Sequence, residues 1–278
     1  MASEGPTGMP PLDSQNPQGN APRAVHVRRM RIGLGTWVVI EATSGSASCA
    51  LRGLEAAFGR IRHVEERMHP EREGSDLRRL RDAPAGTAVA IDPATWAVLS
   101  FAQRLFELSG GVFDPCLPHV AGRLCDLELS SHALKPWARA RVPLSIDCGG
   151  IAKGYAVDCA LEALRAAGCL GGLVNAGGDL RVYGPGLRTL LLRGPDGNYM
   201  PCELREAALA VSDLNATNRP AEHRGYYVRE SRVGGPKRYA AVRAPKAMVA
   251  DALTKCVLLC SPAVALTLMR ELSAEILA

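Results

Sequence analysis

The chain has 278 residues, of which 47% are apolar, and this is enough to bury a core in one compact unit of two lobes. The formal charge of +5 is spread along the chain without lysine-rich runs or interleaved aromatic residues, so no nucleic-acid partner is expected. The nine cysteines form no CxxC pair and no zinc-site spacing, which favours reduced thiols in a reducing compartment. No stretch approaches the roughly 20 apolar residues of a membrane span.

Residues 1–24 differ in composition from the rest of the chain. They are rich in proline, glycine, asparagine and serine, and they lack the apolar segment of a signal peptide. We therefore predict a disordered leader over 1–24 and a folded domain over 25–278. Because no export signal is visible, a cytoplasmic location is expected; a periplasmic one stays open if the start site is misassigned.

Apolar periodicity predicts both helices and strands. Spacings of three and four predict helices at 50–68, 93–108, 152–167, 248–260 and 262–272. Alternating or β-rich runs predict strands at 36–42, 87–92, 144–147 and 239–244, a strand–turn–strand unit at 171–184, and short strands such as TLLLRG and AALAVS within 187–233. Since strands and helices mix without a regular βαβ alternation or a repeat, the predicted fold class is α+β.

Residues 147–158, DCGGIAKGYAVD, contain the most informative motif. The glycines allow a ligand to approach the backbone, and the helix that follows points free N–H groups and its positive dipole end towards that position. An anion is the natural occupant, and Lys153 would add a full positive charge there. The alternative is ordinary turn chemistry before a helix, with Lys153 on the surface.

Three further motifs have a functional and a purely structural interpretation. NAGGDL (175–180) is either a ligand cradle or a tight turn, and FDP (113–115) is either part of a site or a plain turn with an Asx-type bond. ADALTK (250–255) places Asp251 at a helix start, where it either serves a site or pairs with Lys255 at i+4.

The order of these motifs gives a sharper prediction. LGT (34–36), SGGVFDP (109–115), DCGGIAKGYAVD, NAGGDL and ADAL follow one another as in the ApbE family, which this chain resembles from about Gly33 to its C-terminus. The resemblance implies a bilobed fold of mixed sheets packed with helices. It also implies a magnesium-dependent FAD:protein FMN transferase, which passes the FMN half of FAD to a threonine or serine of an acceptor flavoprotein and leaves AMP.

The resemblance also implies a set of site residues. Lys153 and Asp251 would be catalytic, and magnesium would be held by the carbonyl of Ala152 and the carboxylate of Asp251. The cofactor FAD would be bound by Gly35, Thr36, Phe113, Asp114, Asp147, Gly149, Gly150, Lys153, Asn175, Gly177, Gly178 and Asp179.

One position departs from the family pattern in a way that bears on the chemistry. Four residues after the metal-binding aspartate the family has a threonine, whereas this chain has Lys255. Lys255 either forms an ion pair in solvent or enters the cleft and weakens or replaces the magnesium ion. Two alternative functions follow: a non-catalytic flavin-binding homologue, or a hydrolase that converts FAD to FMN and AMP.

Overall fold

The computed structural model describes residues 24–131, 134–214 and 238–278. Its larger lobe is built on an antiparallel sheet of seven strands in the order β1-β2-β6-β7-β10-β11-β12. These strands are β1 (Val25–Gly33), β2 (Thr36–Ser44), β6 (Gly171–Ala176), β7 (Asp179–Tyr183), β10 (Ala208–Asp213), β11 (Tyr239–Ala244) and β12 (Glu275–Ile276). The predicted leader over 1–24 lies, except for Ala24, outside the described residues.

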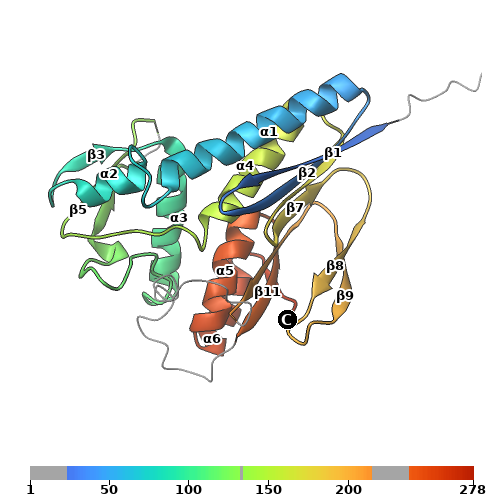
Figure 1. Ribbon diagram of the computed structural model, residues 1–278. Coiled ribbons are helices and arrows are strands. Elements are labelled where there is room, and N and C mark those ends of the chain that lie inside the picture. The colour runs from blue at the N-terminus through green and yellow to red at the C-terminus, as the bar shows by residue number, and fades with distance from the viewer. Residues whose placement is uncertain (1–23, 132–133, 215–237) are drawn as a thin grey trace, which may run out of the picture.

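Both faces of this sheet are covered, but by different elements. Helices α1 (Ala47–Met68), α4 (Ala152–Ala166) and α5 (Ala247–Leu259) enclose the main core on one face, and α6 (Pro262–Glu271) follows α5 (Figure 1). On the other face, the hairpin of β8 (Arg188–Arg193) and β9 (Tyr199–Leu204) covers a smaller apolar cluster. The result is a layered lobe in which the helices that carry the site rest on the sheet.

The smaller lobe lies at the far end of α1 (Figure 1). It holds a three-stranded sheet in the order β3-β5-β4 together with two helices and a short 3-10 turn. These elements are α2 (Asp76–Asp82), β3 (Ala88–Ala90), α3 (Pro93–Leu108), η1 (Leu124–Asp126), β4 (Leu127–Leu129) and β5 (Trp137–Ala140). The predicted α+β class and two-lobed arrangement are therefore confirmed.

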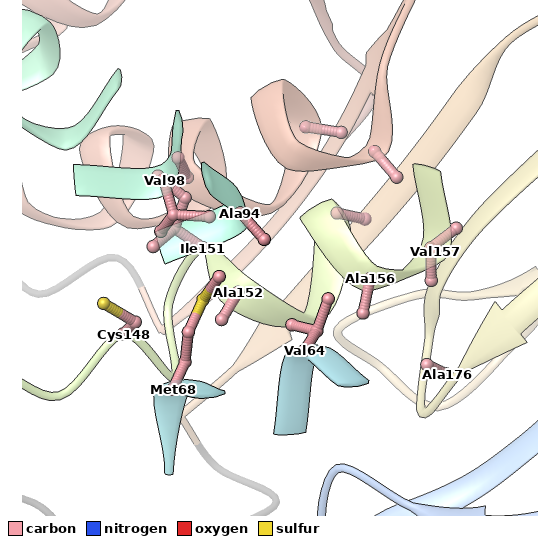
Figure 2. Close-up of a cluster of buried hydrophobic side chains, with 14 of the residues drawn as sticks. Val64, Met68, Ala94, Val98, Cys148, Ile151, Ala152, Ala156, Val157 and Ala176 are labelled. Atoms are coloured by element: carbon pink, nitrogen blue, oxygen red, sulfur yellow. The ribbon is translucent and has the colours of Figure 1, made fainter. Parts of the chain in front are cut away.

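One apolar core joins the two lobes. In Figure 2, side chains from α1, α3, α4 and the segment before α4 meet in a single buried cluster. Val64 and Met68 come from α1, Val98 comes from α3, and Ile151 precedes α4. Since all four are at most 4% exposed, the segment that enters α4 is fixed by packing from both lobes.

The helix boundaries follow from local chemistry. Ser46 caps α1 by accepting a hydrogen bond from the Cys49 N–H. Asp92 caps α3 in the same way, and Pro93 occupies the first turn, where a missing N–H costs nothing. These caps explain why the predicted helices at 50–68 and 93–108 are found within a few residues of their expected bounds.

Strands β4, β5 and β12 were not predicted, and two further features of the sheets differ from the sequence prediction. The strand predicted at 144–147 forms only an isolated bridge between Ile146 and Cys116, because its backbone bonds the loop at 115–117 instead of a neighbouring strand. Strand β1 was not predicted, since its run of arginines hides the alternation of an edge strand. In the part of the chain that is described, no helix combines the length and apolarity needed to cross a bilayer.

Candidate functional site

The glycine loop, residues 147–151, is held by its own backbone and by the core. The Asp147 carboxylate accepts a hydrogen bond of 2.7 Å from the Gly149 N–H, which closes a turn over the loop. The Cys148 and Ile151 side chains are buried in the cluster of Figure 2, and the Ala152 N–H donates to the Cys148 carbonyl at 2.8 Å. The loop therefore presents the first turn of α4 in a fixed orientation.

Helices α4 and α5 cross in direct backbone contact at Gly154. A Cβ atom at this position would lie 2.2 Å from the carbonyl oxygen of Ala247, so only glycine permits the crossing. Close by, the Asp158 carboxylate accepts hydrogen bonds of 2.9 and 3.0 Å from the N–H groups of Ala247 and Met248 and pairs with Arg181. Asp158 thus caps α5 from α4, which sets the position of Asp251 one turn further along.

Four charged side chains lie close together near this crossing, and we call them the Lys–Asp cluster. They are Lys153, Asp179, Asp251 and Lys255. Lys153 forms an ion pair with Asp179 and lies 3.8 Å from Asp251, while Lys255 forms an ion pair with the other oxygen of Asp251. The side chains of Asp251 and Lys255 are 0% and 6% exposed, so this is no solvent pair. Lys153 is the most accessible of the four, with 22% of its side chain exposed.

The two carboxyl groups of the cluster differ electrostatically. Burial, together with the neighbouring charge of Asp251, raises the pKa of Asp179 even though Lys153 opposes this shift. Burial also acts to raise the pKa of Asp251, but Lys153, Lys255 and the Gly154 N–H at 3.1 Å outweigh it, and the pKa of Asp251 is lowered. Asp251 is therefore the carboxylate that pairs with Lys255 and is approached by Lys153, whose direct partner is Asp179.

A pocket opens beside the cluster. It is small, with a cavity volume of about 30 Å³, and its lining residues come from the FDP segment, the glycine loop and α5: Val112, Phe113, Asp114, Pro115, Asp147, Gly150, Ile151, Lys255 and Leu259. The structure thus brings together three of the predicted motifs, since Lys255 belongs to ADALTK. Asp114 itself is tied to the Cys116 N–H and to Arg123, each at 3.0 Å, so its carboxylate shapes the pocket wall.

The remaining predicted cofactor residues gather at two adjoining turns. Gly35, with φ of +69°, lies in the β1–β2 turn, and a Cβ atom on Gly177 would lie 2.7 Å from Oγ1 of Thr36. Asn175 accepts a 3.0 Å hydrogen bond from the Gly178 N–H and so closes the β6–β7 turn. Asn175 pairs in register with Leu180, on the face of the sheet opposite to Asp179, and it does not line the pocket.

The donor set does not fit a divalent metal ion. Among the residues that the structure describes, no group of three or more histidine, cysteine, aspartate or glutamate side chains could hold one. Both oxygens of Asp251, the predicted magnesium ligand, already receive hydrogen bonds, from Lys255 and from the Gly154 N–H. Oxygen-rich coordination, which magnesium requires, would have to displace an ammonium group from Asp251.

Some residues next to the cluster were not anticipated. The hydroxyl groups of Ser212 and Thr254 lie 2.7 Å apart, and the Thr254 hydroxyl donates to the Asp251 carbonyl, which fixes α5 against β10. Oδ1 of Asp179 is buried without a hydrogen-bond partner in the described part of the chain. The signal in the sequence for the Ser212–Thr254 contact was a polar residue, Thr254, inside the apolar body of a predicted helix.

Several solved ApbE proteins have folds similar to that of this chain. A flavin transferase ApbE from Vibrio cholerae superposes with a TM-score of 0.74 at 17% identity, covering 91% of this chain and 93% of the other. The apo flavinyl transferase ApbE of Pseudomonas stutzeri gives 0.74 at 18% identity, covering 91% and 90%. An ApbE protein from Thermotoga maritima gives 0.70 at 21% identity, covering 84% and 87%.

At identities this low, the structural similarity establishes the fold alone. The family is established by comparison of the sequence. A search of curated protein sequences finds no match. The ApbE family model, in contrast, matches residues 34–278, which include the glycine loop, both turns and the whole Lys–Asp cluster. This chain belongs to the ApbE family.

Proposed function

We propose that this protein is an FAD:protein FMN transferase that attaches FMN to a threonine or serine of an acceptor flavoprotein. The observation that carries the proposal is the Lys–Asp cluster, which lies at the N-terminus of α4 beside the pocket. A helix N-terminus and a partly exposed ammonium group at one place suit a pyrophosphate. The solved flavin transferases of similar fold support a flavin nucleotide as the ligand.

The proposed reaction is a displacement at phosphorus. The acceptor hydroxyl oxygen forms a bond to the FMN phosphorus, the bond from that phosphorus to the bridging oxygen breaks, and AMP leaves with that oxygen. The hydroxyl proton passes to solvent. Such transfers depend mainly on positioning and charge neutralisation.

Within the cluster, the residues have separate tasks. Lys153 neutralises charge on the pyrophosphate, since it is the more accessible ammonium group and lies in the first turn of α4. Asp251 and Asp179 are positioning residues: Asp251 holds Lys255, and Asp179 holds Lys153. The Gly150 backbone allows the ligand to approach the helix, and Phe113 contributes apolar surface to the pocket.

The experiment that tests this proposal follows both products of FAD. The purified protein is incubated with FAD and with an extract of cells from which its own gene has been deleted. AMP is then measured by chromatography, and covalent flavin is detected as in-gel fluorescence after denaturation. A transferase releases AMP and labels a protein band in equal amount.

Two other outcomes would assign a different function. AMP and free FMN without a labelled band would show a hydrolase, in which water replaces the protein hydroxyl. FAD binding without release of AMP would show a non-catalytic homologue. Replacing Lys153 by methionine is the control, because it should abolish both signals if they arise at the cluster.

A further inference from the structure

Lys255 occupies the position on Asp251 that a metal ion would need. Its ammonium group contacts Oδ1 of Asp251, and Oδ2 is taken by the Gly154 N–H and approached by Lys153. We propose that Lys255 is the resident cation of this site, so that the protein binds the pyrophosphate of FAD without a divalent metal ion. This inference rests on the proposed function and specifies how that site neutralises its ligand.

The path of the Lys255 side chain shows that it belongs to the site. Lys255 follows Asp251 by four residues, so both lie on one face of α5. Its stem lies over the glycine loop: a Cβ atom on Gly150 would be 3.2 Å from Cε of Lys255. Lys255 also lines the pocket together with Asp147 and Gly150. A lysine pointing to solvent would make none of these contacts.

The charges of the cluster argue against an additional divalent ion. Two ammonium groups already face two carboxyl groups, and all four side chains are largely buried. An ion placed on Asp251 would lie close to both lysines, and like charges repel strongly where water is scarce. Among the described residues, no third aspartate, glutamate, histidine or cysteine side chain joins Asp179 and Asp251 in a group that could hold such an ion.

The ligand class follows from the number and placement of the positive groups. Lys153 and Lys255 approach Asp251 from its two oxygens, and the first turn of α4 adds its positive end. A dinucleotide pyrophosphate carries two negative charges, one on each phosphate. Although both ammonium groups are paired with carboxyl groups, each has further N–H groups that can donate to a phosphate oxygen. As point charges they do not bridge phosphate oxygens with the fixed geometry of a metal ion.

The test is a calorimetric titration of FAD into the wild-type protein, once in excess EDTA and once in millimolar magnesium chloride. We expect the two dissociation constants to agree within about twofold. Tight binding in magnesium together with loss of binding in EDTA would overturn the inference and leave the proposed function standing. Absence of FAD binding under both conditions would refute the proposed function and this inference with it.

A charge-removing variant gives an independent measurement. Lys255→Met keeps the apolar stem over Gly150 but removes the ammonium group, so in EDTA it should raise the dissociation constant for FAD by about tenfold to a hundredfold. Lys246→Met is the matched control, because it removes the same charge from an exposed position at the start of the same helix. Circular dichroism checks folding, and unchanged affinity in a folded Lys255→Met protein would overturn the inference.

Discussion

Replacing Gly154 by alanine should separate α4 from α5 and weaken both stability and ligand binding. The added Cβ atom would lie 2.2 Å from the Ala247 carbonyl oxygen, 2.6 Å from the Ala247 carbonyl carbon and 2.8 Å from the Met248 Cα. All three are backbone atoms, so no side chain can rotate away. Ordinary contact begins near 3.5 Å, so the helices must move apart by roughly 1 Å.

The magnitude follows from two opposing terms. Forcing an extra carbon into a packed contact costs about 1–3 kcal/mol, and backbone on both sides places this site at the upper end. The higher helix propensity of alanine returns at most about 1 kcal/mol. We therefore expect the free energy of unfolding to fall by about 2 kcal/mol. The same movement lengthens the bond from the Gly154 N–H to Asp251, so FAD affinity should fall as well.

Urea denaturation followed by circular dichroism measures this change. Gly59→Ala is the matched control, because Gly59 lies inside α1 and an added Cβ atom there meets nothing within 4 Å. That control should stabilise the protein, by up to about 1 kcal/mol. If Gly154→Ala were as stable as Gly59→Ala, then α4 and α5 would not be in direct backbone contact at Gly154.

Three further substitutions test other parts of the site. Lys153→Met should weaken FAD binding by about tenfold to a hundredfold in a fluorescence titration while leaving riboflavin affinity unchanged; equal losses for both would place Lys153 away from the phosphates. Asp158→Asn removes the charge that caps α5, and urea denaturation should show a loss of about 2–4 kcal/mol; a loss near zero would contradict that role. Gly177→Ala should destabilise more than Gly35→Ala in the same assay, because their φ values are similar, +64° and +69°, but only the first meets Thr36; the reverse order would refute the contact.

The sequence predicted much of the fold because its helices carry strong local signals. Helices α1, α3 and α4 begin at capping or proline residues or after the glycine loop, and their apolar residues recur at helical spacing. The glycine turn at 177–178 was equally clear. Strand β1 was missed because an edge strand can present arginines where alternation would be expected, and its partner β2 determines its place.

The site was predictable only in part, for a physical reason. Sequence spacing put Asp251 and Lys255 on one helix face, but whether that face meets solvent or the cleft depends on the crossing at Gly154, which no local pattern reveals. The internal pairing of Lys153 with Asp179 was also unexpected, since the motif indicated an external anion. The prediction of magnesium came from the family pattern, and the described side chains do not support it.

The most direct test of the central claim compares FAD with riboflavin in binding to the wild-type protein. In the proposed function, the Lys–Asp cluster and the first turn of α4 bind phosphate groups, which riboflavin lacks, while the apolar surface of the pocket is open to both ligands. Isothermal titration calorimetry should therefore give an affinity for FAD at least about tenfold higher than for riboflavin. Equal affinities for the two ligands would contradict the account, because the cluster would then contribute nothing to binding.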